Sequence, residues 1–171
     1  MRAPGFSLPA TDGSMVSFDD VMGKNGLVVV FICNHCPYVK AITDRMVMDA
    51  GTLREMGVGF VAICSNDAVS YPQDSFENMK IFARERGFSF PYLHDETQEV
   101  ARAYGAVCTP DFFGISSEGI IEYRGRMDSG KTERPPVDAR RELVEAMAEI
   151  IRTGKGPGEQ IASVGCSIKW V

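Results

Sequence analysis

Five cysteines occur among the 171 residues, and two of them form a spaced pair in the segment Cys33-Asn34-His35-Cys36. Two thiols separated by two residues can form a disulfide that opens and recloses without unfolding the surrounding chain. Cysteine and histidine at short spacing are also ligands that zinc accepts. The segment therefore predicts redox chemistry or metal binding, and the choice depends on the elements that position it.

The residues on either side of the pair predict a strand followed by a helix. Gly26 to Ile32 is a continuous apolar run rich in β-branched residues, which is typical of a strand buried on both faces of a sheet. From Cys36 to near Gly57, apolar residues recur at steps of three and four, the spacing of an amphipathic helix. Unpaired amides and the helix dipole favour a thiolate at such a junction, and we assign this position to Cys33. A protonated His35 would favour the same thiolate.

The rest of the chain alternates between predicted strands and helices. We expect strands at 58–64, 90–93, 111–116 and 120–124, and helices at 75–86, 97–104 and 137–152. This order predicts an α/β fold of three layers, with helices flanking a central mixed sheet. Residues 1–171 are expected to form one domain, and residues from about 155 to 171 a C-terminal tail that docks on it.

Composition excludes several classes of partner. The chain is 44% hydrophobic and has a net charge of −5, so it offers no cationic surface for nucleic acid or an anionic membrane. Its longest apolar run is too short for a membrane span, and its first residues show no apolar signal segment. An odd number of scattered cysteines is typical of a reducing compartment. We therefore expect a cytoplasmic protein without a cofactor, and its oligomeric state stays open.

A second informative position is Thr109-Pro110, which directly precedes the predicted strand at 111–116. With this position the chain resembles the thioredoxin fold, because Phe31-Ile32-Cys33-Asn34-His35-Cys36-Pro37 follows a buried strand and Cys108-Thr109-Pro110 comes about 75 residues later. Residues 3–13, APGFSLPATDG, more narrowly resemble the opening of the alkyl hydroperoxide reductase/thiol-specific antioxidant family, the peroxiredoxin-like branch of that fold. Residues 123–128 and 165–170 are similar to a thioredoxin-like or peroxiredoxin-like subgroup, so the resemblance covers nearly the whole chain.

The resemblance implies roles for individual residues. It makes Cys33 the attacking thiol, Cys36 its resolving partner and Pro110 a cis-proline that faces the dithiol, with His35 and Thr109 in support. Two further cysteines stay open as extra redox thiols: Cys108, two positions before the proline, and Cys166, in the tail. Arg126 is a candidate partner for an anion or the thiolate, whereas Cys64 is expected in the core.

The sequence also departs from the peroxiredoxin pattern, Pro-x-x-x-Thr/Ser-x-x-Cys, whose hydroxyl binds peroxide. Counting back from Cys36 puts Cys33 at the hydroxyl position and Val29 at the proline position, and counting from Cys33 puts Val30 and Gly26 there. Loss of a preorganised hydrogen-bond donor at a reacting centre lowers the rate by roughly two to three orders of magnitude. Disulfide exchange needs no such donor.

Three functions therefore remain open. We predict a thiol–disulfide oxidoreductase in which Cys33 attacks a disulfide and Cys36 resolves the mixed disulfide. The alternatives are a thiol-dependent peroxidase and a non-catalytic metal-binding module that uses Cys33, His35, Cys36 and Cys108. The expected partners of the enzyme are a protein or small-molecule disulfide or peroxide as substrate, and a reducing dithiol.

Overall fold

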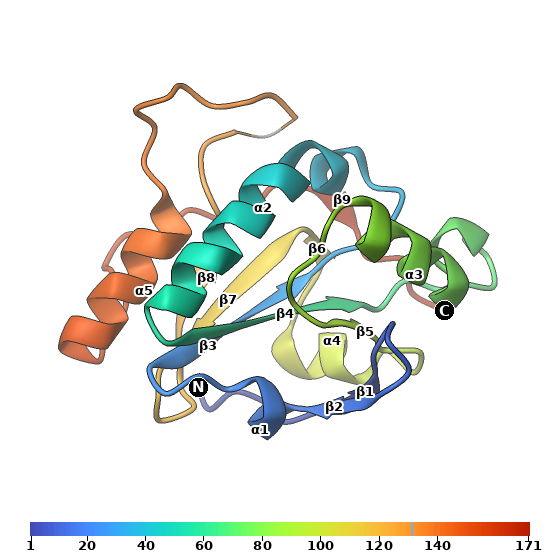
Figure 1. Cartoon of the computed structure of the whole chain (residues 1–171), viewed down its shortest axis with the longest axis horizontal. Helices are drawn as coiled ribbons and strands as arrows, with labels where there is room; N and C mark the ends of the chain where they lie inside the picture. Colours follow the sequence, from blue (N-terminus) through green and yellow to red (C-terminus); the bar gives the residue numbers. More distant parts are fainter. Residues whose placement is uncertain (131) are drawn as a thin grey trace.

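A computed structural model describes residues 1–130 and 132–171, and a five-stranded mixed sheet with strand order β5-β4-β3-β7-β8 lies at its centre (Figure 1). The pairs β3/β4 and β4/β5 are parallel, whereas β3/β7 and β7/β8 are antiparallel. The strands of this sheet are β3 (Gly26–Phe31), β4 (Val58–Cys64), β5 (Tyr92–His94), β7 (Asp111–Ile115) and β8 (Ile121–Gly125). The predicted α/β class with a mixed sheet is confirmed.

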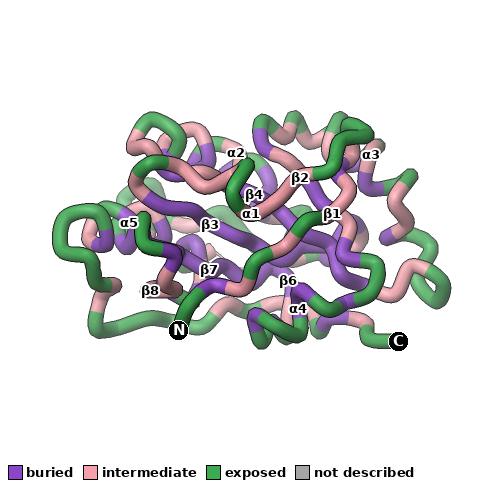
Figure 2. Tube along the Cα trace, turned by 90° about the horizontal axis from the view of Figure 1, so that it is seen from below, coloured by how far each residue is buried: buried purple, intermediate pink, exposed green. Residues whose placement is uncertain are grey.

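Strand β3 occupies the middle of the sheet, and all six of its residues are buried (Figure 2). Its apolar run suits this place, because a central strand covered on both faces needs apolar side chains in both directions. Val29 lies opposite Val61 of β4 on one side and Phe113 of β7 on the other. The residues that follow β3 therefore start from a rigid, fully buried base.

Helices cover both faces of the sheet (Figure 1). Helices α2, α3 and α5 pack on one face, where their apolar residues meet alternate strand residues such as Val28 and Val30. Helix α4 and the N-terminal hairpin with its short helix α1 pack on the other face, against residues such as Val29 and Phe31. The helices are α1 (Phe18–Val21), α2 (Pro37–Glu55), α3 (Phe76–Glu85), α4 (Glu99–Tyr104) and α5 (Glu142–Thr153), and a 3-10 turn, η1 (Pro72–Asp74), precedes α3. Among the described residues, no helix combines the length and apolarity of a membrane span.

Two parts of the fold differ from the sequence prediction. The last helix was expected to begin at Val137, but α5 begins at Glu142, because Val137 is fully exposed and has no apolar contact to hold an extra turn. Two short antiparallel pairs were not predicted at all, since strands of two or three residues carry no readable alternation. These pairs are β1 (Ser7–Pro9) with β2 (Met15–Ser17), and β6 (Cys108–Thr109) with β9 (Cys166–Ser167).

The C-terminal tail, residues 155–171, returns along the sheet to β6 and is anchored by side chains of its own. Ile168 is almost fully buried in the core on the α4 side, and its amide donates to the carbonyl of Val107 at 3.0 Å. Trp170, two residues later, lies partly exposed beneath the guanidinium of Arg102 at 4.4 Å from the ring centroid. Ile168 therefore supplies the apolar anchor of the tail.

Replacing Ile168 by alanine should lower the free energy of unfolding by about 2 to 4 kcal/mol, because it removes buried methyl groups and leaves a cavity. Chemical denaturation of purified protein measures the change. Ile161→Ala is the matched control, since Ile161 lies in the same tail with 39% of its surface exposed. An equal loss in both variants would show that the tail is not anchored through Ile168.

Candidate active site

The CNHC segment, residues 33–36, connects the end of β3 to the start of α2. Helix α2 begins at Pro37, and Cys36 is its N-cap. Proline is favoured at the first helical position because its fixed φ suits the helix and its missing N–H would have no partner there. The helix predicted from Cys36 is therefore confirmed, and Cys33 lies between the end of β3 and this helix.

Both thiols of the segment are fully buried and face Thr109. The Sγ atom of Cys33 lies 3.5 Å from the Thr109 hydroxyl, and the Sγ atom of Cys36 lies 3.4 Å from the Thr109 carbonyl oxygen, to which the protonated thiol donates. The Thr109–Pro110 peptide bond is cis. The structure thus brings Thr109 and Pro110 to the dithiol.

The surroundings of the two thiols drive their pKa values apart. The pKa of Cys36 is lowered to about 4, first by a hydrogen bond from the Cys33 thiol, and further by the Cys166 thiol and the backbone amides of Val39 and Cys166. The pKa of Cys33 is strongly raised, first because its thiol donates to Cys36 and then because it is buried. These shifts favour a thiolate on Cys36 over one on Cys33, the reverse of what the sequence predicted.

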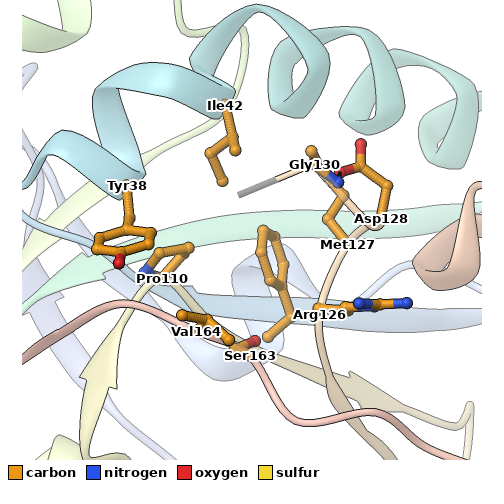
Figure 3. Close-up of a pocket in the computed structure, with 10 residues that line it drawn as sticks. Tyr38, Ile42, Pro110, Arg126, Met127, Asp128, Gly130, Ser163 and Val164 are labelled. Atoms are coloured by element: carbon orange, nitrogen blue, oxygen red, sulfur yellow. Dashed lines mark hydrogen bonds between the residues drawn. The ribbon is translucent and has the colours of Figure 1, made fainter. Parts of the chain in front are cut away.

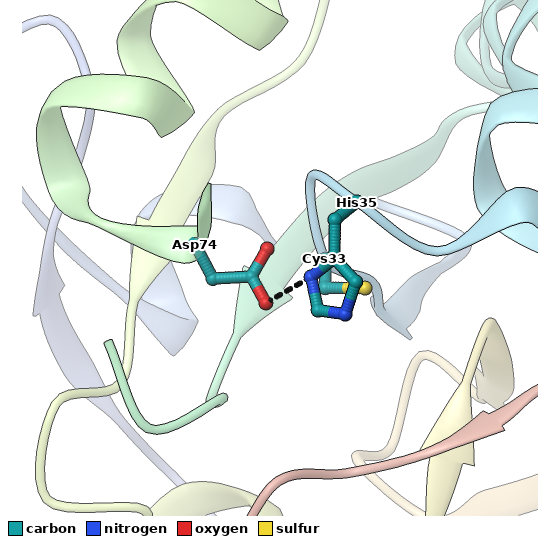
Figure 4. Close-up of side chains that lie close together, drawn as sticks. All are labelled: Cys33, His35 and Asp74. Carbon is teal, nitrogen blue, oxygen red and sulfur yellow. Dashed lines mark ion pairs between the residues drawn. The ribbon is translucent and has the colours of Figure 1, made fainter. Parts of the chain in front are cut away.

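His35 is directed at Asp74, a residue that the sequence analysis did not single out (Figure 4). The Nδ1 atom of His35 lies 2.6 Å from a carboxylate oxygen of Asp74, and Asp74 is fully buried. Two more donors reach the same carboxylate at 2.8 Å, the backbone amide of Asn34 and the side-chain amide of Asn66. Asp74 thus fixes the CNHC segment from η1. In the sequence it looks like an ordinary polar residue before a helix.

The structure does not assemble the metal site considered from the sequence. Within residues 1–130 and 132–171, the group whose ligand atoms come together is Cys33, His35 and Asp74, all within 4.8 Å of one another. Cys36 and Cys108 are not part of it. Because Asn34 and Asn66 already donate to the Asp74 carboxylate, this group fits a hydrogen-bonded scaffold better than an open metal site.

Of the three remaining cysteines, Cys166 is a neighbour of the dithiol, whereas Cys108 and Cys64 have other surroundings. Cys166 lies on β9 directly opposite Thr109, packs against the cluster that contains Cys36 and lowers the pKa of Cys36. Cys108 is directed at the carbonyl of Pro110 at 3.6 Å, and burial raises its pKa to about 11. Cys64 is fully buried on β4, where burial raises its pKa to about 12, as expected for a core residue.

An apolar hollow lies between the first turns of α2, Pro110 and the C-terminal tail, and it shares Pro110 with the cis bond that follows Thr109 (Figure 3). Arg126 borders this hollow, but its guanidinium pairs with Glu142 at 2.8 Å. Asp128 on the same rim is paired with Arg45 at 2.8 Å. Both charges are therefore neutralised within the chain, and Arg126 is not placed as the partner of a thiolate. The hollow is lined by Tyr38, Ile42, Pro110, Phe112, Arg126, Met127, Asp128, Gly130, Ser163 and Val164.

Comparison with known proteins supports both the fold and the family that the sequence predicted. The AhpC/TSA family model matches residues 1–124. Peroxiredoxin Bcp of Escherichia coli is 30% identical over 132 residues, which are 77% of this chain and 80% of that protein. The crystal structure of a conserved protein from Geobacillus kaustophilus is 44% identical, with a TM-score of 0.91 over 100% of this chain and 91% of that one. A thioredoxin-family thiol:disulfide interchange protein from Chlorobium tepidum, 23% identical over 88% of this chain and 96% of that one, shares the fold with a TM-score of 0.67.

These likenesses, together with the mixed sheet and the buried dithiol, define a thiol oxidoreductase of the thioredoxin-fold class. The chain belongs to the AhpC/TSA family, as residues 3–13 predicted. The family match ends at residue 124, so it does not cover the tail that contacts Cys36. The family match therefore does not identify the substrate.

A thiolate on Cys36 should persist at neutral pH and disappear only as the pH falls through about 4. An unfolded cysteine has a pKa of about 8.5. The lowered value therefore stabilises the fold above that pH, and this stabilisation is lost as the pH falls toward about 4. The ultraviolet absorbance of the thiolate, followed from acid to neutral pH, measures the midpoint.

Three variants identify the origin of that midpoint. Cys36→Ser should remove the transition. Cys33→Ala should raise the midpoint, because it deletes the main donor, and Cys33→Ser should raise it less, because a hydroxyl still donates. A transition that survives in Cys36→Ser would assign the thiolate to another cysteine.

Gly165 sets how closely the tail can approach the dithiol. A methyl group added at Gly165 would collide with the Thr109 carbonyl, the same group that Cys36 contacts. Gly165→Ala should therefore push β9 away from β6 and increase the alkylation rate of Cys36 by iodoacetamide. Gly158→Ala is the matched control, because an added methyl there meets open space. Equal rates in both variants would show that β9 does not cover Cys36.

Proposed function

We propose that this protein catalyses thiol–disulfide exchange with Cys36 as the attacking thiolate. The observation that carries the proposal is the position of Cys36 as the N-cap of α2, at the positive end of the helix dipole. The lowered pKa of Cys36, caused first by the Cys33 thiol, supports the same assignment. A nucleophilic thiolate needs this kind of stabilisation near neutral pH. The proposal reverses the roles expected from the sequence, in which Cys33 attacked.

The reaction begins when the Cys36 thiolate attacks one sulfur of a substrate disulfide. The substrate S–S bond breaks, a mixed disulfide forms on Cys36, and the second substrate sulfur leaves as a thiolate. Cys33 is next to Cys36 and can attack its sulfur once its own proton passes to the leaving thiolate. That second step releases the other half of the substrate and leaves a Cys33–Cys36 disulfide. A reducing dithiol then restores both thiols.

Disulfides suit the site better than peroxides. The hydroxyl of Thr109 contacts Cys33 rather than Cys36, and Arg126 is paired with Glu142. The site therefore aims neither a hydroxyl nor an arginine at the Cys36 sulfur from these positions, whereas exchange between sulfurs requires neither. Thiol peroxidase activity remains the second candidate, because the family match and the likeness to peroxiredoxin Bcp both favour it.

The apolar hollow indicates the kind of disulfide that binds. Tyr38 and Ile42 of α2 and Pro110 present apolar surface there, and the charges at its rim are already paired. A disulfide flanked by uncharged, apolar groups would lose least on entering such a site, because no charge has to be stripped of water. Five free thiols fit a reducing compartment, and we place the reaction in the cytoplasm.

Two double variants test which thiol attacks. In both, Cys166 is replaced by serine so that the tail thiol cannot react, and each then keeps one thiol of the CNHC segment. The Cys33→Ser/Cys166→Ser variant should form one mixed disulfide with glutathione, at Cys36, when it is incubated with glutathione disulfide. The Cys36→Ser/Cys166→Ser variant should form none at Cys33. Mass spectrometry of the intact protein and of its peptides measures both.

A glutathione adduct at Cys33 in the second variant would restore the roles predicted from the sequence. If neither variant forms an adduct, disulfide exchange is contradicted. A parallel stopped-flow measurement with hydrogen peroxide separates the second candidate. Oxidation of Cys36 by peroxide at a rate far above that of free cysteine would make peroxidase the function of this site.

A further inference from the structure

The C-terminal tail brings a third thiol to the dithiol. Cys166 pairs across the β6/β9 ladder with Thr109, whose carbonyl also contacts the Cys36 sulfur. Cys166 also packs against the buried cluster that contains Cys33 and Cys36, and its thiol and backbone amide both lower the pKa of Cys36. Two thiols therefore neighbour Cys36: Cys33 from its own loop and Cys166 from a segment far along the chain.

Contacts on both sides of Cys166 hold it in this place. Before it, the hydroxyl of Ser163 donates to the carbonyl of Gly125 at 2.6 Å. After it, the amide of Lys169 donates to Asn66 at 3.0 Å, and the amide of Asp67 donates to the Lys169 carbonyl at 2.8 Å. A tail tied at both ends holds its middle residue at a defined position, so the approach of Cys166 to Cys36 is built into the fold.

The three thiols differ in their access to solvent. Cys33 and Cys36 are fully buried, whereas Cys166 is partly exposed. A disulfide between Cys33 and Cys36 would therefore be enclosed on both sides. A disulfide between Cys36 and Cys166 would have one sulfur at the surface, where a second protein can reach it. An external dithiol attacks an exposed sulfur faster than an enclosed one.

We propose that Cys166 is a resolving thiol for Cys36 and carries the oxidation out to the surface. The inference rests on the proposed function, in which Cys36 attacks. The thiol of Cys166 loses its proton to the departing thiolate and its sulfur attacks Cys36 in the mixed disulfide. The Cys36–Cys166 bond forms as the bond from Cys36 to the substrate breaks. An external dithiol then reduces the new disulfide to two thiols and is itself oxidised.

The local charges favour Cys166 over Cys33 for this step. Cys33 is enclosed near the buried carboxylate of Asp74, which opposes formation of a second negative charge. Cys166 has Lys169 nearby, which favours its thiolate. Burial and the hydrogen bond to Cys36 still raise the pKa of Cys166 to about 11, so it holds its proton until Cys36 has reacted.

Trypsin separates the alternatives in one digest, because Cys33 and Cys36 share the peptide 25–40 and Cys166 lies in the peptide 156–169. The reduced protein is oxidised with one equivalent of glutathione disulfide, blocked with iodoacetamide and digested without reductant. We expect peptides 25–40 and 156–169 to be joined by a disulfide. The same link should form in Cys33→Ser, where only Cys36 can supply it from peptide 25–40.

Turnover is measured as reduction of insulin disulfides by dithiothreitol. Cys166→Ser should slow it by roughly tenfold, because resolution then depends on the enclosed Cys33. Cys108→Ser is the matched control, since Cys108 is also half-buried but is directed at the carbonyl of Pro110. It should leave both the link and the turnover unchanged.

The outcomes separate this inference from the function on which it rests. If oxidised protein contains only a disulfide inside peptide 25–40, and Cys166→Ser turns over at the wild-type rate, Cys166 is not a resolving thiol and exchange through Cys36 stands. If Cys36→Ser retains turnover, the proposed function fails as well. Backbone bonds hold β9 in place, so the serine variant is expected to fold, and circular dichroism checks this.

Discussion

The site depends on a carboxylate that has no contact with water. Asp74 is fully buried, and a buried charge costs several kcal/mol unless donors surround it. Its donors come from Asn34 and His35 in the CNHC segment and from Asn66 in the loop after β4. Asn66 in turn accepts from the tail at Lys169. One charge thus makes three separate segments adopt positions that depend on one another.

That constraint explains how two neighbouring thiols acquire different properties. Cys33 follows the buried strand β3, and its pKa is raised first by its interaction with Cys36, then by burial and by the nearby Asp74 carboxylate. Cys36 is three residues further on, at the beginning of a nineteen-residue helix, and its pKa is lowered, first by the Cys33 thiol. The two cysteine side chains are identical, but the loop between them leads from the sheet to the start of the helix. Their surroundings therefore make the Cys33 thiol the proton donor and the Cys36 sulfur the acceptor.

Local sequence patterns were sufficient for the framework and insufficient for the site. The apolar runs that became β3 and β4, and the periodicity that became α2, predicted the central layers because such patterns reflect burial directly. Pro37 marked the first helical residue in the sequence, but the opposite pKa shifts of Cys33 and Cys36 could not be read from it. Asp74 and the pairing of Cys166 with Thr109 could not be read from the sequence, since each contact joins distant segments and leaves no local pattern.

The tail is held largely through main-chain groups, and this has an evolutionary consequence. Backbone hydrogen bonds such as that from Ile168 to Val107 make few demands on side-chain identity. Selection on the tail should therefore fall on a few positions: Gly165, where a side chain does not fit, Cys166, and the buried Ile168. The other residues between α5 and Gly165 are freer to change, apart from Gly156, where a side chain would collide with the Glu122 carbonyl, and Ser163, whose hydroxyl donates to Gly125. A short, nearly invariant block after a variable stretch is what such a tail should leave in the sequences of related proteins.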